Sequence, residues 1–196
     1  MGMHVKVIAI TGGPCAGKTS VMGVVRDELV HKGASVRLVP EAATDLIMEG
    51  IAPWTCPSML DFQTQVIRLQ LEREADALNS GAAIVVCDRG VCDSRAYLAG
   101  EEYSRALSAN RLAAREALVR YDAVFHLESI ALADPAAYTR ANNTARFESV
   151  AEAVAADRRT LDAWSAHPNR HIVGNASSLA AKASALIAAL VEELGL

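Results

Sequence analysis

The stretch that decides the fold runs from Ile8 to Ser20 and reads IAITGGPCAGKTS. It places the pattern G-x-x-x-x-G-K-T after an apolar run, and residues 20–31 then follow a helical apolar period. Glycines let backbone N–H groups approach polyphosphate oxygens where any Cβ would block them, and a helix that starts there directs its positive end at the anion. Because a chance glycine turn needs neither a strand before it nor a helix after it, the pattern predicts a phosphate-binding loop.

Two residues of this loop have distinct expected roles. Lys18 is expected to reach the β and γ phosphates as a point charge, and the Thr19 hydroxyl to bind Mg²⁺, so the implied cofactors are ATP and Mg²⁺. Asn175 follows the last expected strand, where it either contacts the nucleotide base or forms a turn. The residues expected to hold the nucleotide are Gly12, Gly13, Pro14, Cys15, Ala16, Gly17, Lys18, Thr19, Ser20 and Asn175.

Length and composition are those of one α/β domain over residues 1–196, with 52% hydrophobic residues to bury in a core. The net charge of −4 offers no broad basic field, so nucleic acid is not an expected partner. No run of 18 apolar residues and no signal peptide is found, so we expect a soluble protein without membrane attachment. Four cysteines without metal-binding spacing suit a cytoplasmic location, and the oligomeric state stays open, a homodimer included.

Strands and helices alternate along the whole chain, which predicts a parallel sheet covered on both faces. Strands are expected at 5–10, 35–39, 82–87, 123–127 and 170–173, and helices at 19–32, 42–49, 58–78, 93–98, 102–120, 148–166 and 177–194. The expected architecture is a three-layer α/β/α P-loop NTPase fold whose five-stranded parallel sheet has the order 2-3-1-4-5. Residues 129–147 are polar and interrupted by Pro135, which favours a lid.

The helix expected at 58–78 has the clearest boundary signal. Ser58 with Asp61 three residues later is typical of a helix N-cap. The inward stripe expected from the helical period consists of Met59, Phe62, Val66 and Leu69.

Polar residues follow the expected strands at the edge where an open α/β sheet gathers its functional groups. Asp88 comes directly after the strand at 82–87 and could hold Mg²⁺, although a helix-capping Asp is the alternative. Arg89 stands where ring-type ATPases place a water-activating glutamate, so phosphoryl transfer is favoured over hydrolysis. Glu41 could orient an acceptor hydroxyl or take its proton, or could be a solvated residue at a helix start.

Arg140 and Arg146 in the expected lid could close over the nucleotide and neutralise charge on the transferred group, or could be solvated loop arginines. Four further residues could line an acceptor pocket or lie on helix surfaces, namely Gln63, Gln65, Arg68 and Asp93. Trp54 beside Pro53 and Pro57 could cap a substrate cleft or anchor an irregular loop.

Four segments carry a resemblance that spans almost the whole chain: TGGPCAGKTS (11–20), PEAA (40–43), CDRGVCDSRAY (87–97) and RANNTARFE (140–148). They resemble the kinase-like ATPase domain found in the ribosylnicotinamide kinase half of the NAD-biosynthesis regulator family and in related AAA family ATPase domains, and more distantly the deoxynucleoside and thymidylate kinases. The resemblance implies that Gly12 to Thr19 form the nucleotide loop and Glu41 is the acceptor-side carboxylate. It also implies a metal and substrate pair and two cover arginines, which are Asp88 with Arg89 and Arg140 with Arg146.

Two functions from different classes fit these residues. The first is a small-molecule kinase that moves the ATP γ-phosphate to a hydroxyl of a nucleoside-like or nucleotide-like acceptor. The second is a nucleotide-dependent binding module or regulatory switch with slow hydrolysis. A GTP switch would carry an N-K-x-D motif, which the sequence lacks.

Overall fold

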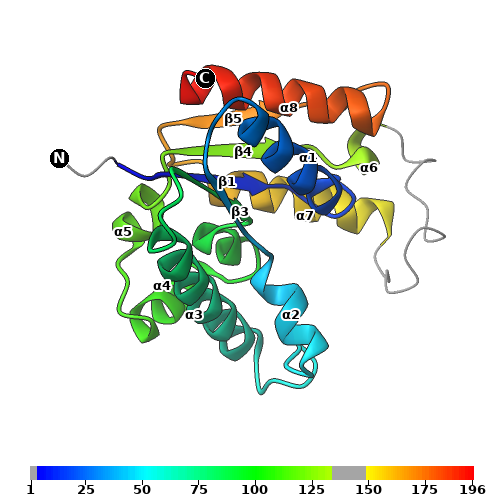
Figure 1. The fold of residues 1–196 in the computed structure, drawn as a ribbon. Coiled ribbons are helices and arrows are strands. Elements are labelled where there is room, and N and C mark those ends of the chain that lie inside the picture. Colours follow the sequence, from blue (N-terminus) through cyan, green and yellow to red (C-terminus); the bar gives the residue numbers. More distant parts are fainter. Residues whose placement is uncertain (1–3, 134–148) are drawn as a thin grey trace.

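A five-stranded parallel sheet lies between two layers of helices in the computed structural model, which describes residues 4–133 and 149–196 (Figure 1). The strand order β2-β3-β1-β4-β5 confirms the expected topology. The strands are β1 (Lys6–Thr11), β2 (Val36–Val39), β3 (Ile84–Asp88), β4 (Ala123–Leu127) and β5 (Arg170–Val173). The helices are α1 (Lys18–His31), α2 (Ala42–Met48), α3 (Met59–Leu78), the 3-10 helix η1 (Val91–Ala96), α4 (Gly100–Ala109), α5 (Ala114–Val119), α6 (Ile130–Ala133), α7 (Val150–Ala163) and α8 (Leu179–Leu194).

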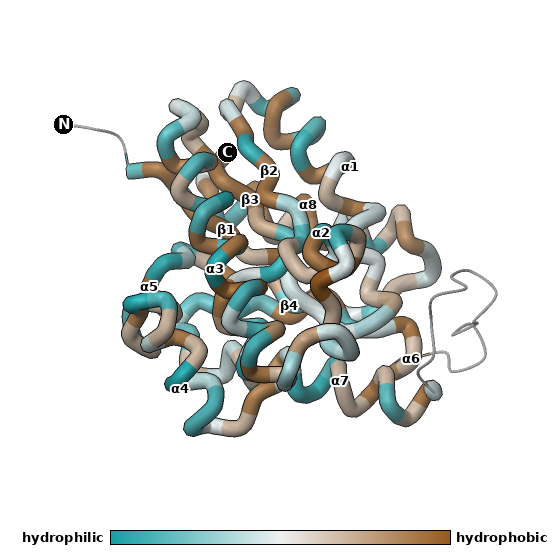
Figure 2. The backbone as a smooth tube through the Cα atoms, turned by 90° about the horizontal axis from the view of Figure 1, so that it is seen from below, coloured by the Kyte–Doolittle hydropathy of each residue, from teal (hydrophilic) through white to brown (hydrophobic). Residues whose placement is uncertain are grey.

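Successive residues of the central strand β1 face opposite helical layers. Val7 and Ala9 belong to a core shared with α3, α4, α5 and α7, whereas Ile8 and Ile10 belong to one shared with α1 and α8. Figure 1 shows these two groups of helices on opposite sides of the sheet, and Figure 2 shows hydrophilic colour frequent along the outlying α4 and α5. Because both faces of the sheet are covered, β3 and β4 are buried along their whole length.

The inward face of α3 differs from the expected stripe. Phe62 is buried as expected, but Val66 and Leu69 are half-buried and Met59 is 39% exposed. Polar side chains share the inward face with apolar ones, so the stripe expected from the apolar residues alone lies part of a turn away from the observed buried face. The buried residues of α3 are Phe62, Gln63, Ile67, Gln70, Glu74 and Ala77.

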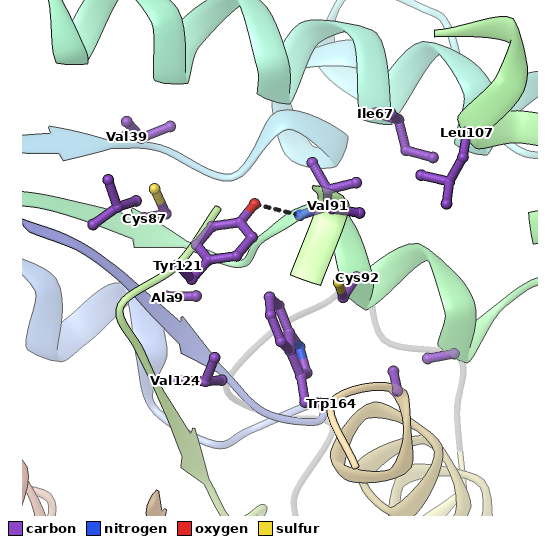
Figure 3. Packing of buried hydrophobic residues seen from close by; sticks show 14 of the residues in the cluster. Ala9, Val39, Ile67, Cys87, Val91, Cys92, Leu107, Tyr121, Val124 and Trp164 are labelled. Atoms are coloured by element: carbon purple, nitrogen blue, oxygen red, sulfur yellow. Dashed lines mark hydrogen bonds between the residues drawn. The ribbon is translucent and has the colours of Figure 1, made fainter. Parts of the chain in front are cut away.

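A buried carboxylate explains why polar residues can occupy that face. Glu74 is 1% exposed and accepts hydrogen bonds from Gln70 Nε2 (2.9 Å), Tyr121 Oη (2.6 Å) and Arg120 Nη2 (2.7 Å). The Tyr121 hydroxyl in turn accepts from the backbone N–H of Val91 at 2.7 Å, within the cluster drawn in Figure 3. The network therefore satisfies buried polar groups and fixes the chain just after β3.

The helix expected at 102–120 is two helices, α4 and α5, with a turn between them. Asn110 ends α4, because its side-chain Nδ2 donates to the carbonyl of Ala106 at 2.9 Å. Arg111 then adopts the left-handed conformation with φ 56°, which a continuous helix cannot contain. The helix expected at 93–98 is the 3-10 helix η1, which begins at Val91.

Part of the expected lid lies within the described chain. Residues 130–133 form the short helix α6, whereas 134–148, with Arg140 and Arg146, lie outside the described residues. In the ranges that the structure describes, none of the helices combines the length and apolarity that crossing a bilayer requires.

The hydrogen bonds of Tyr121 give a test of the buried network. We expect Tyr121→Phe to lower the free energy of unfolding by about 1–3 kcal/mol, because it leaves the buried Val91 N–H without an acceptor. Urea denaturation followed by circular dichroism measures this, with Tyr97→Phe at a 44% exposed tyrosine as the matched control. Equal stability of the two variants would contradict the role given to Tyr121.

Candidate functional site

The loop between β1 and α1 is held so close to neighbouring backbone that two of its positions require glycine. Gly12 has φ 147°, and a Cβ there would lie 2.3 Å from the carbonyl oxygen of Leu127 at the end of β4. A Cβ on Gly13 would lie 2.6 Å from the Cβ of Asp157 on α7. These glycines therefore serve the packing of the loop as well as the approach of a phosphate.

Asp157, which the sequence analysis missed, fastens the loop to β4 and α7. It is 1% exposed, and its Oδ1 accepts from the backbone N–H of Gly13 (2.8 Å) and of Ser129 (3.0 Å). Oδ2 lies 3.3 Å from His126 Nε2. Burial favours the neutral acid, but the His126 contact and the N–H donors outweigh it and lower the pKa of Asp157. No motif marks this helical aspartate, because its partners lie far away in the sequence.

Lys18 lies inside the loop, where only neutral oxygens meet its charge directly. Its Nζ donates to the carbonyls of Gly12 (3.0 Å) and Gly13 (3.3 Å), and the residue is 8% exposed. Burial is the main cause that lowers the pKa of Lys18 to about 8, and the positive charge of the Arg89 guanidinium is the second. A phosphate oxygen would compensate this ammonium better than carbonyls do, so the loop is prepared for an anion.

Thr19 and Asp88 supply adjacent hard oxygen atoms beside the loop. The Thr19 hydroxyl donates to Asp88 Oδ2 at 3.5 Å, while Asp88 Oδ1 is buried without a hydrogen-bond partner among the described residues. Burial raises the pKa of Asp88 to about 6. An unpartnered buried carboxylate oxygen next to a hydroxyl fits Mg²⁺, which binds one or two protein oxygens and retains waters. Thr19 and Asp88 would supply two ligands. Among the described residues, no group of three or more His, Cys, Asp or Glu side chains could hold a metal ion.

Arg89 brings the two carboxylates flanking it into one network. Its backbone has φ 70°, and its Nε donates to Glu41 Oε1 at 2.5 Å while Nη1 donates to Asp93 Oδ1 at 3.0 Å. Burial opposes ionisation of Glu41, but the Arg89 and Lys18 charges and a hydrogen bond from Thr44 outweigh it and lower its pKa. The structure thus holds Glu41 through Arg89 and Thr44, with its side chain 25% exposed.

Asp93 is a structural centre of this network. Besides Arg89, its oxygens accept from Thr11 Oγ1 (2.5 Å), Gly90 N (3.0 Å) and Trp164 Nε1 (3.1 Å), and it is 4% exposed. Four donors occupy the carboxylate, so Asp93 holds the guanidinium of Arg89 in place.

A cavity of about 290 Å³ begins at Glu41 and Arg89 and extends between α2, α3 and η1. Gln63 lines it, as the sequence allowed, and its buried amide donates to the Met59 sulfur at 3.9 Å. Gln65 and Arg68 do not line it: they contact Cys56 and Glu72 instead. Trp54 is 77% exposed and is not among the lining residues, although its neighbour Pro53 is.

A second cavity, of about 790 Å³, follows the phosphate-binding loop. Gly13 to Ser20, Ile130 and the segment 175–179 line it, and Ile130 and Leu179 lie against the loop itself. Asn175 lines the same cavity, together with Lys182 of α8, which the sequence analysis did not single out. Lys18 lines this second cavity, whereas Arg89 lines the first.

The raised pKa of Asp88 yields a prediction for the nucleotide-free protein. Its folded-state pKa of about 6 exceeds the ordinary 3.8, so the ionised carboxylate destabilises the fold by up to about 3 kcal/mol above pH 6, and by nothing once both states are protonated below pH 4. We expect Asp88→Asn to raise the free energy of unfolding by about 1–2 kcal/mol at pH 7.5 and by less at pH 5.

Urea denaturation at both pH values, without Mg²⁺ or nucleotide, measures this difference. The exposed Asp27→Asn variant is the control for loss of a carboxylate. A gain in Asp88→Asn that grew as the pH fell would contradict the assignment.

Comparisons with known proteins agree with this geometry. A family model described as an AAA domain matches residues 7–182. The structure of NadR protein in complex with NAD and AMP-PNP has a TM-score of 0.64 and 17% identity over 98% of this chain, which spans only 50% of the NadR chain. Thymidylate kinase from Ehrlichia chaffeensis has a TM-score of 0.64 and 14% identity, over 97% of this chain and 98% of its own.

These identities establish a common fold, and the resemblance read from the sequence is confirmed at that level. No curated protein matches the chain. With a family match over most of its length and a P-loop between β1 and α1, the chain belongs to the AAA domain family of P-loop proteins.

Proposed function

We propose that this protein is a phosphotransferase that moves the γ-phosphate of ATP, with Mg²⁺, to a hydroxyl of a nucleoside-like or nucleotide-like acceptor. The observation that carries the proposal is the cavity of about 290 Å³ that is lined by Glu41 and Arg89. A nucleotide hydrolase has no need of a second cavity at this point. Two fold relatives, a thymidylate kinase and NadR with AMP-PNP bound, point in the same direction.

The residues of the loop would bind and orient the triphosphate. Lys18 would exchange its carbonyl contacts for phosphate oxygens, and Thr19 with Asp88 would hold Mg²⁺. When bound, Mg²⁺ neutralises charge on the phosphates and orients them for in-line transfer. Positioning and electrostatics of this kind account for most of the catalysis in phosphoryl transfer.

On the acceptor side, Glu41 and Arg89 would act as a pair. The carboxylate would accept the hydrogen of the acceptor hydroxyl, and its bond to Arg89 keeps it in one orientation. Arg89, itself held by Asp93, would place positive charge beside the transferred group. The apolar lining of the cavity, with Phe62, Ile67 and Val91, suits a flat ring attached to that hydroxyl.

A panel of acceptors tests the proposal. We expect ADP formation from ATP and Mg²⁺ to increase at least about tenfold when the correct nucleoside, nucleotide or vitamin is present, because the acceptor completes the site. Coupled detection of ADP across the panel measures it, and mass spectrometry identifies the phosphorylated product. Uniform slow hydrolysis together with tight nucleotide binding would favour the alternative, a nucleotide-dependent switch.

The role of Lys18 can be tested with an isosteric change. We expect Lys18→Met to abolish acceptor phosphorylation while the fold persists, because the variant retains side-chain volume but loses the charge on the phosphates. Lys32→Met removes an exposed lysine at the end of α1 and should keep wild-type turnover. Full activity of Lys18→Met would exclude the assigned role.

Glu41 is tested by separating turnover from ATP binding. We expect Glu41→Gln to lower kcat by about 100-fold or more while the Kd for ATP changes less than about threefold, since the carboxylate serves the acceptor. Steady-state kinetics and calorimetry supply the two values, and Glu49→Gln at an exposed position of α2's end is the control. Parallel losses in both quantities would argue against an acceptor-side role.

A further inference from the structure

The cavity at the phosphate-binding loop contains an amide whose orientation is fixed. With the phosphates bound at Gly13 to Ser20, the base of a nucleotide in the same cavity would lie along the rest of its lining, which includes the segment 175–179. Asn175 presents a side-chain amide to this cavity, and its backbone N–H donates to Glu128 Oε2 at 3.3 Å. Its position in the cavity is thereby set by contacts on both main chain and side chain.

Two neighbours determine which way this amide points. Asn175 Nδ2 donates to the carbonyl of Ser129 at 2.9 Å, and Asn175 Oδ1 accepts from Lys182 Nζ at 3.3 Å. If the amide turned over, its NH₂ group would face the ammonium of Lys182 and its oxygen would face the carbonyl of Ser129. Both contacts would become repulsive, so one orientation is strongly preferred.

Lys182, which donates to Asn175 Oδ1, is itself held in place. It is 5% exposed, and its Nζ also donates to the carbonyl of Glu128. It forms no salt bridge within residues 4–133 and 149–196, so its direct partners are neutral oxygens that its ammonium can orient. Leu179, one turn earlier on α8, and Ile130 provide apolar surface in the same cavity.

The hydrogen-bonding groups of the amide that remain free match the N6/N7 edge of adenine. After its two protein contacts, the amide retains a lone pair on Oδ1 and a hydrogen on Nδ2. Adenine offers the complementary pair, an amino hydrogen on N6 and the acceptor N7, which is how Asn binds adenine bidentately elsewhere. A 6-oxopurine in the same placement sets its carbonyl oxygen against Oδ1, where two acceptors repel.

We propose that Lys182 is a positioning residue that fixes Asn175 in the orientation selecting adenine over guanine nucleotides. The inference rests on the nucleotide binding contained in the proposed function, but it requires no phosphoryl transfer. Lys182 lies on α8, the last helix. It would influence which base is bound by orienting Asn175, without contacting the nucleotide itself.

Calorimetry with AMP-PNP and GMP-PNP in the presence of Mg²⁺ and without acceptor tests the proposal. We expect the wild-type protein to bind AMP-PNP at least about tenfold more tightly, in line with the discrimination of a bidentate amide contact. Lys182→Met should lower the ratio of the two Kd values, because the amide then keeps only its Ser129 contact and its orientation is less strongly fixed. Lys32→Met, which also removes one lysine charge, should leave the ratio unchanged.

Two further measurements separate base selection from other roles of Lys182. Inorganic tripolyphosphate should bind Lys182→Met and the wild type equally, since the lysine is assigned to the base end; an equal loss for tripolyphosphate would overturn the proposal. Asn175→Ala, which leaves Lys182 in place, should also remove the preference, and this variant decides the matter if Lys182→Met does not fold.

Equal binding of the two analogues by the wild type, or a preference that persists in Asn175→Ala, would overturn the inference and leave the kinase proposal intact. Conversely, failure of every acceptor in the panel would refute the kinase proposal without altering the ratio of Kd values.

Discussion

The Asp93 carboxylate is the interaction on which the rest of the structure depends. Its donors come from Thr11 at the end of β1, from Arg89 and Gly90 after β3, and from Trp164 at the end of α7. One buried group therefore joins two central strands, a helix of the outer layer and the guanidinium of the site. Because a buried carboxylate is tolerable only when its oxygens are satisfied, these four contacts are mutually dependent.

Burial is also the common cause of the unusual acidities at the site. It lowers the pKa of Lys18 and raises that of Asp88, so both groups are closer to neutrality than they would be in water. The loop and the carboxylate thus carry an electrostatic cost in the unliganded state. An anion at Lys18 and a cation at Asp88 would each relieve it, which couples the two binding events.

The sequence predicted those parts of the structure that rest on local patterns. The loop at 12–19 is a contiguous motif, and Glu41, Asp88 and Arg89 follow apolar strands, so their placement at one edge of a parallel sheet followed from the alternation of elements. Asp157 and Lys182 could not be predicted in this way. Each is a single polar residue of a helix, and its partners lie in other elements or loops, 28 or more positions away except for Asn175 beside Lys182, with no motif to connect them.

The prediction of the inward face of α3 was wrong for a related reason. Hydrophobic periodicity assumes that polar residues face solvent, yet Glu74 is buried because Gln70 of the same helix and the consecutive residues Arg120 and Tyr121 after α5 supply hydrogen-bond donors. The helix break at Asn110 likewise depends on side-chain contacts rather than on composition. Arg140 and Arg146 stay predictions, since they lie outside the described residues.

The positions of the two tryptophans have a spectroscopic consequence. The Trp164 indole is fully buried and donates to Asp93, whereas Trp54 is 77% exposed and follows Pro53, which lines the cavity at Glu41 and Arg89. Their fluorescence should therefore differ in emission wavelength and in access to acrylamide. The blue-shifted component would monitor the integrity of the carboxylate network, and the quenchable component would monitor the segment next to Pro53, within one unlabelled molecule.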